Sequence, residues 1–135
     1  MTLIRGGTVV NGTGSPGFVG DVLVDRDRIA DVAPSICAPS AETVDASGCL
    51  VTPGFIDVHA HSDAYLILEP SAPSKISQGI TTEINGQCGG SAAPRYGEAR
   101  LPSDWASLLA DRLSWRSLAE YREEFDKARP AINSV

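Results

Sequence analysis

Short apolar runs separated by turn-forming residues fill the first part of the chain. The runs expected to form strands are residues 3–5, 8–10, 21–24, 29–32, 43–45 and 50–52. Gly6-Gly7 and Asn11-Gly12 are typical of tight turns, and the polar turn at 25–28 predicts a hairpin between the runs that flank it. Short strands at this spacing predict a small β domain over residues 1–52, either a β-sandwich or a half-barrel, and we expect the β-sandwich.

The pattern changes at Pro53-Gly54, which begins a run of alternating residues that ends in His-x-His. Residues 55–61 predict a strand. Because side chains alternate along a strand, its apolar residues share one face, and Asp57, His59 and His61 share the other. We expect the apolar face to pack against helices and the polar face to line an interior.

Strand and helix patterns alternate after this run. A helix is predicted at 71–78 with Gly79 as its stop, and β-branched residues predict a strand at 80–85. Two further helices, one from Ser103 and one at 117–129, precede a strand-like end at 130–135. The apolar stripes expected on these two helices consist of Trp105, Leu108, Leu109, Leu113, Leu118, Tyr121 and Phe125.

Alternating strands and helices of this kind predict parallel βα units. We therefore expect an α/β chain in which the β-sandwich domain is followed, over residues 53–135, by the first βα units of a (β/α)8 TIM-like barrel. Such a barrel takes about 250 residues. The barrel is therefore expected to be incomplete in this chain.

Composition and charge narrow the class of protein. The net charge of −6 disfavours nucleic acid and anionic membranes as partners, because both attract clustered Lys and Arg. The chain has no apolar run of membrane-spanning length and no signal-peptide core, so we expect a cytoplasmic protein. Three cysteines at irregular spacing do not predict disulfides, and Cys37 and Cys49 are expected to be small apolar residues in or near β structure.

The candidate chemistry lies at the ends of the two strands predicted after Pro53. His59 and His61 are the only histidines of the chain, and their i, i+2 spacing on a strand lets both reach one metal ion. Cys88 follows the next predicted strand, whose end is adjacent in a parallel barrel, and a thiolate suits zinc. The alternatives are two satisfied polar histidines and an inert cysteine in a tight loop.

Two acids flank the histidine pair. Asp57 either orients an imidazole through a hydrogen bond or is a buried acid satisfied by the backbone. Asp63 either contacts substrate at the mouth of the barrel or caps the next segment of chain.

Five segments together resemble one known family. They are LIRGGTVVNGTG at 3–14, VDASG at 44–48, VTPGFIDVHAHSD at 51–63, QGITTE at 78–83 and CGGSAAP at 88–94. Over essentially its whole length the chain resembles the N-terminal portion of the N-acyl-D-amino-acid deacylase (D-aminoacylase) family, within the amidohydrolase superfamily. The His-x-His segment marks the superfamily, and the cysteine at this distance narrows it to the deacylases. Gln87 departs from the asparagine that often precedes the cysteine.

The resemblance implies a zinc-dependent hydrolase of linear amide C–N bonds. Its small-molecule substrate is an N-acyl-D-amino acid, which reacts with water to give a D-amino acid and a carboxylate. His59, His61 and Cys88 match the family's metal ligands, for one or two zinc ions, and Asp63 matches the acid after the pair. The general base and the remaining ligands are expected beyond Val135, so this chain by itself is expected to be an inactive fragment.

Two other functions remain open. One is a cyclic-amide hydrolase, similar to dihydropyrimidinase or dihydroorotase. Such enzymes generally place a carboxylated lysine in the metal-bridging role, so Cys88 favours the deacylase. The other is a non-catalytic remnant or an interaction module built on the β domain. A reading frame that continues with further histidines and an aspartate would favour the enzyme.

Overall fold

The computed structural model of the chain describes residues 1–98, 100, 103–109 and 114–135. These residues form two compact units, Met1–Pro53 and Gly54–Val135. The division falls beside Pro53, the residue at which the sequence pattern changes from short strands to alternating strands and helices.

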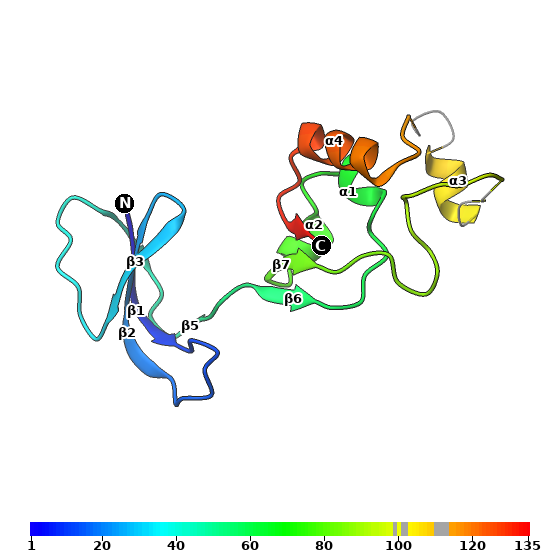
Figure 1. Cartoon of the computed structure of the whole chain (residues 1–135). Coiled ribbons are helices and arrows are strands. Elements are labelled where there is room, and N and C mark those ends of the chain that lie inside the picture. The colour runs from blue at the N-terminus through cyan, green and yellow to red at the C-terminus, as the bar shows by residue number, and fades with distance from the viewer. Residues whose placement is uncertain (99, 101–102, 110–113) are drawn as a thin grey trace. The chain divides into compact units, whose positions relative to one another are not determined.

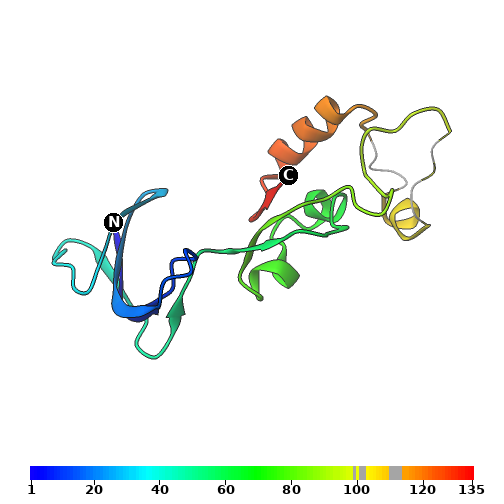
Figure 2. The ribbon, with the colours of Figure 1, turned by 60° about the horizontal axis from the view of Figure 1, so that its bottom comes forward.

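The first unit is a single mixed sheet. β1 (Thr2–Val9) pairs antiparallel with β2 (Phe18–Asp25), which pairs antiparallel with β3 (Arg28–Ala33). On its other edge β1 pairs in parallel with β4 (Glu42–Asp45) and β5 (Leu50–Val51), which occupy successive halves of that edge. The predicted hairpin is therefore confirmed (Figures 1 and 2), but the described residues of this unit form one sheet and not the two layers of a sandwich.

β1 runs without interruption through Gly6-Gly7, so the turn predicted there was wrong. Gly6 has a φ of 73°, which glycine adopts without steric cost, and the pairing with β2 shifts register between Ile4 and Gly7. The glycines thus form a bulge inside one strand. The Asp21 carboxylate accepts hydrogen bonds from the main-chain N–H groups of Gly6 and Ile36, both at 2.9 Å, and ties the bulge to a later loop.

The second unit is built on three parallel strands that lie in chain order. They are β6 (Phe55–Asp57), β7 (Ile80–Glu83) and β8 (Asn133–Ser134). Helices occupy both connections between these strands, which is the arrangement of consecutive βα units (Figure 1). The predicted strand at 80–85 and the strand-like end of the chain are therefore confirmed, with shorter bounds.

Four helices are described in these connections. α1 (Tyr65–Leu68) and α2 (Pro73–Ile76) lie between β6 and β7, and α3 (Ser103–Leu109) and α4 (Leu118–Ala128) lie between β7 and β8. α1 was not predicted, because an apolar run of four residues has no polar face to reveal a helical period. None of the described helices combines the length and apolar character needed to cross a lipid bilayer.

β6 ends earlier than the predicted strand at 55–61, and its faces are reversed from the expectation. Ile56 and Val58 remain 61% and 67% exposed. Asp57 instead faces α2, whose Lys75 reaches its carboxylate. We expected Ile56 and Val58 to pack against helices, and this expectation was wrong. The side of β6 that faces α2 carries Asp57, which pairs with the ammonium group of Lys75.

Two apolar clusters hold the helices of the second unit. One consists of Ala64, Ala92, Ala93, Trp105, Leu109 and Trp115, and the other of Leu66, Ala72 and Ile132 with Phe125 packed against it. The indole N–H of Trp115 donates to the carbonyl of Ala92 at 2.8 Å, so this large side chain is buried with its polar atom satisfied. Two residues of the predicted apolar stripes, Leu108 and Leu118, are exposed, so their predicted place in the core was wrong. Leu113, also predicted in a stripe, lies outside the described residues.

α4 begins with a reciprocal cap that fixes its first turn. The Ser117 hydroxyl accepts a hydrogen bond from the main-chain N–H of Glu120 at 3.2 Å, and the Glu120 carboxylate accepts one from the N–H of Ser117 at 2.8 Å. These bonds satisfy two donors that a helix start leaves unpaired. The helix predicted at 117–129 is confirmed.

The buried carboxylate of Asp21 predicts a pH dependence for the first unit. Hydrogen bonds from Ile36 and Gly6 hold the pKa of Asp21 below its ordinary value of 3.8. Because the folded-state pKa is the lower one, this stabilisation is fully present above the unfolded-state pKa. It is lost as the pH falls through the folded-state pKa.

We expect Asp21→Asn to remove that part of the acid sensitivity. Asp27→Asn, on the exposed turn between β2 and β3, is the matched control and is expected to leave it unchanged. Circular dichroism during acid titration measures both variants, and equal curves for the two would contradict the role given to Asp21.

Candidate metal centre

The three predicted ligands lie in two loops that follow adjacent parallel strands. His59 and His61 follow β6, and Cys88 follows β7. The loops stay connected beyond the end of β6, because the main-chain N–H of Ala60 donates to the carbonyl of Ile84 at 3.0 Å. The prediction that the histidines lie in a regular strand was therefore wrong. Their loop is nevertheless hydrogen-bonded to the chain that follows the neighbouring strand.

The side chains of His59, His61 and Cys88 converge in this region. One nitrogen or sulfur atom of each lies within 4.8 Å of the others, and all three side chains are exposed. His59 Nε2 lies 3.1 Å from Cys88 Sγ, and the two imidazole centroids are 5.3 Å apart. Cys88 has a φ of 55°, which is uncommon outside glycine and which is found preferentially at functional sites.

This donor set fits zinc. Zinc binds histidine nitrogen at about 2.0–2.1 Å and cysteine sulfur at about 2.3 Å in a tetrahedron, which places ligand atoms about 3.5 Å apart. The 3.1 Å contact and the 4.8 Å limit bracket that spacing. Cys37 and Cys49 are also exposed and free but belong to the first unit, and among the described residues the ligand cluster includes only Cys88.

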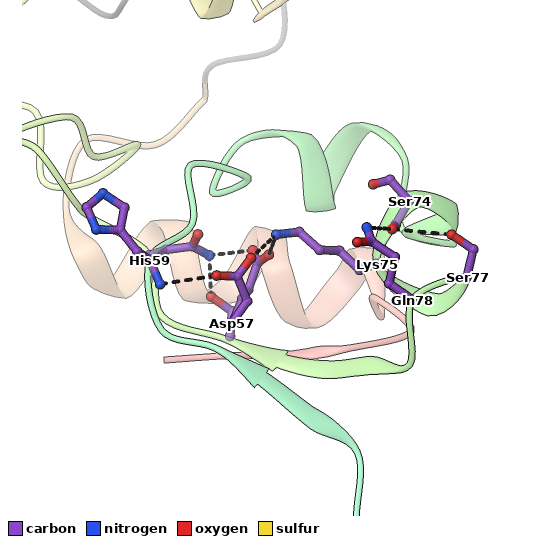
Figure 3. A network of polar contacts seen from close by, with 9 residues as sticks. Asp57, His59, Ser74, Lys75, Ser77 and Gln78 are labelled. Atoms are coloured by element: carbon purple, nitrogen blue, oxygen red, sulfur yellow. Dashed lines mark hydrogen bonds and ion pairs between the residues drawn. The ribbon is translucent and has the colours of Figure 1, made fainter. Parts of the chain in front are cut away.

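Asp57 is hydrogen-bonded to the main chain of His59 and to the side chain of Lys75. Its Oδ1 accepts a hydrogen bond from the main-chain N–H of His59 at 3.2 Å, and its Oδ2 accepts one from Lys75 Nζ at 2.6 Å. The imidazole of His59 points away from this carboxylate (Figure 3). The hydrogen bonds, chiefly that from Lys75, hold the pKa of Asp57 below its usual range. Asp57 was considered either as a residue that orients an imidazole or as an acid satisfied by the backbone. Its hydrogen bond to the main-chain N–H of His59 is a contact of the second kind.

Lys75 and Glu83 adjoin the candidate site, although the sequence analysis did not identify either residue. Lys75 Nζ lies 3.2 Å from Glu83 Oε2, and the two side chains are 16% and 0% exposed. Burial lowers the pKa of Lys75, but its hydrogen bonds to Asp57 and Glu83 outweigh burial and raise the pKa overall. The sequence did contain one signal for them. Asp57 and Glu83 lie at matching positions of two successive strands, and two neighbouring carboxylates need a cation close to both.

Asp63 is buried beneath the loop that carries Cys88. Its Oδ1 accepts hydrogen bonds from the main-chain N–H groups of Gly86 at 3.2 Å and Ala92 at 3.4 Å. Its own carbonyl accepts one from the Tyr121 hydroxyl at 2.8 Å. Burial is the largest influence on this carboxyl group and raises its pKa. The observed contacts of Asp63 therefore hold the loop in place.

A groove of about 380 Å³ adjoins the candidate centre at His61. Its walls come from α1, α2 and the chain between them, and the lining includes Tyr65, Leu66, Pro73 and Ser74. A concave surface of this size with mixed apolar and polar walls is suited to a small organic molecule.

Known proteins are similar to this chain over almost its whole length. The amidohydrolase family profile matches residues 42–134. An N-acyl-D-glutamate deacylase from Alcaligenes xylosoxydans xylosoxydans is 39% identical over 97% of this chain, and a D-aminoacylase from the same organism is 38% identical over 98%. The chain spans 27% and 28% of the length of these two curated relatives.

Solved structures give the same family. A crystal structure of D-aminoacylase matches with a TM-score of 0.84 and 40% identity, over 98% of this chain and 28% of that one. An N-acyl-D-glutamate deacylase from Bordetella bronchiseptica, complexed with zinc and a phosphonate mimic of the tetrahedral intermediate, matches with a TM-score of 0.85 and 37% identity. That match covers 99% of this chain and 28% of the other. The chain therefore belongs to the amidohydrolase family.

Proposed function

We propose that this chain provides part of the zinc site of an N-acyl-D-amino-acid deacylase. The reaction is hydrolysis of a linear amide to a D-amino acid and a carboxylate. The observation that carries the proposal is the convergence of two imidazoles and one thiol group at the ends of adjacent parallel strands. The relatives named N-acyl-D-glutamate deacylase and D-aminoacylase, one of them complexed with zinc, support the same chemistry.

Each proposed ligand contributes differently to the site. His59 and His61 bind as neutral imidazoles and Cys88 as a thiolate, so the three together carry one negative charge. Zinc, when bound, acts as a Lewis acid toward an amide carbonyl. The site takes one or two ions, since a related D-aminoacylase is described as having a binuclear metal center. The general base is not assigned to a residue of this chain.

The groove beside His61 is the proposed place for the acyl amino acid. It opens next to the ligand cluster, and Tyr65 and Leu66 give it apolar wall area. We assign Asp63 to the support of the Cys88 loop, in place of the substrate contact expected from sequence, because its carboxylate is buried and bonded to that loop.

Zinc binding by variants of this chain tests the ligand assignment. We expect His59→Ala and Cys88→Ala to abolish stoichiometric zinc binding, because each removes one of three donors. Cys49→Ala is the matched control, since Cys49 is also exposed and free and is expected to be without effect. Equilibrium dialysis of the reduced protein, followed by metal analysis, measures all three. Zinc content that survives in Cys88→Ala would refute the assignment.

The role of Asp63 is tested by comparing two substitutions. Asp63→Asn keeps a side-chain oxygen that can accept the N–H groups of Gly86 and Ala92, whereas Asp63→Ala removes it. We expect Asp63→Ala to weaken zinc affinity by about 10–100-fold, as is typical when a residue that orients a ligand is lost. Asp63→Asn is expected to stay near the wild-type affinity. Equal affinities for the two variants, measured by competition with a chromogenic chelator, would count against the loop-holding role.

The activity itself is tested on the gene product that contains this chain. We expect release of D-amino acids from N-acyl-D-amino acids, with the L-enantiomers left intact, in a zinc-dependent manner. Chiral chromatography of the products measures this directly. Hydrolysis of cyclic amides without hydrolysis of N-acyl-D-amino acids would contradict the deacylase proposal and support a cyclic-amide hydrolase.

A further inference from the structure

Two acids stand next to each other in one row of the parallel sheet. Asp57 of β6 is paired with Glu83 of β7, and Glu83 is paired with Ser134 of β8. Residues paired in this way present their side chains on the same face. Like charges directly opposite each other on neighbouring strands are unfavourable, so this row requires a cation close to both carboxylates.

Lys75 of α2 supplies that cation. Its Nζ lies 2.6 Å from Asp57 Oδ2 (Figure 3). The same nitrogen lies 3.2 Å from Glu83 Oε2. Among the described ion pairs, no other basic side chain reaches either carboxylate. Glu83 also accepts a hydrogen bond from Asn85 Nδ2 at 2.8 Å, and the same nitrogen donates to Ser134 Oγ at 2.7 Å. The network therefore spans all three strands.

The network reaches the ligand loops from both strands. On the β6 side, Asp57 holds the main-chain N–H of His59 with the carboxylate oxygen that Lys75 leaves free. On the β7 side, Glu83 is the last residue of the strand that leads to Cys88. Lys75 is thus bonded to the strand that ends before His59 and to the strand that ends before Cys88.

We propose that Lys75 is a positioning residue of the metal centre. By binding Asp57 and Glu83 together it sets the spacing of the two strand ends, and this spacing holds the His59 and Cys88 side chains close enough to share one ion. The inference rests on the proposed function, because it takes His59 and Cys88 as zinc ligands. Lys75 does not touch the ion in this account and acts on it through the two carboxylates. Its side chain also lines the groove beside His61, so zinc binding, and not substrate turnover, is the readout that tests this role.

The chain offers a matched control for this role, since Lys127 is its only other lysine. Lys127 also pairs with a carboxylate, that of Glu124 at 2.7 Å, but on the exposed surface of α4. We expect Lys75→Met to weaken zinc affinity by about 10–100-fold and Lys127→Met to leave it unchanged. Lys75→Arg keeps the charge and is expected to recover part of the loss, since its guanidinium reaches carboxylates with a different geometry.

A spectroscopic readout separates positioning from a general loss of stability. Cobalt(II) in place of zinc gives a thiolate-to-metal charge-transfer band that reports the bond to Cys88. At saturating cobalt, in samples folded by circular dichroism, we expect this band to be weakened or shifted in Lys75→Met and unchanged in Lys127→Met. A lysine that only stabilised the fold would leave the band of the folded protein as in the wild type.

A second experiment uses the wild-type chain and does not depend on the folding of a variant. Zinc and the Lys75 network must stabilise each other if they are coupled. Zinc is therefore expected to slow acylation of Lys75 by an amine-reactive reagent at least about tenfold, with Lys127 unchanged, as read by mass spectrometry. Equal rates with and without zinc, or equal slowing of both lysines, would overturn the inference.

The outcomes also separate this inference from the proposed function. A gene product that contains this chain and the remaining ligands, and that takes up no zinc, would contradict both. A wild-type chain that binds zinc, with Lys75→Met binding as tightly and giving the same cobalt spectrum, would contradict only the role of Lys75.

Discussion

The parallel pairing of β6 with β7 is the constraint on which the candidate metal centre depends. Parallel strands place their carboxyl ends at the same edge of a sheet, so the loops that follow them start side by side. His59 and Cys88 are 29 positions apart in the chain, yet His59 Nε2 and Cys88 Sγ lie 3.1 Å apart because each leaves one of these two strand ends. A small shift between the strands would separate the donors.

The ionic network beneath the ligands protects that pairing. Glu83 is fully buried, and Lys75 and Asp57 are partly buried, with side chains 16% and 27% exposed. Removing one partner of a buried ion pair leaves an uncompensated charge and typically costs about 3–5 kcal/mol. The fold can therefore keep two carboxylates in one row of the sheet only while Lys75 lies against them. The loop that carries His59 depends on Lys75 as well, because its main-chain N–H donates a hydrogen bond to the Asp57 carboxylate that Lys75 holds.

Local patterns predicted much of this structure. The hairpin of β2 and β3 follows from a polar turn between two apolar runs, and α4 follows from its apolar spacing. The features that were missed depend on contacts between distant segments. β4 and β5 share one edge of β1, which no local pattern reveals. Gly6-Gly7 forms a bulge because a neighbouring strand continues past it, where the dipeptide alone is typical of a turn.

The candidate site shows the same division between local and distant information. Spacing and chemical type singled out His59, His61 and Cys88, and the structure brings these three together. Lys75 and Glu83 were not identified, because their importance arises only when a helix residue meets two strands. Asp63 was expected either to contact substrate or to cap the next segment. Its carboxylate accepts hydrogen bonds from the Cys88 loop, and such contacts between distant segments are properties of the folded chain.

Zinc K-edge X-ray absorption of the zinc-loaded chain, with Cys37 and Cys49 replaced by alanine, tests the central claim most directly. In that variant Cys88 is the only possible cysteine ligand. The account predicts one sulfur at about 2.3 Å and histidine nitrogens at about 2.0–2.1 Å. A spectrum with nitrogen and oxygen neighbours but no sulfur would contradict it.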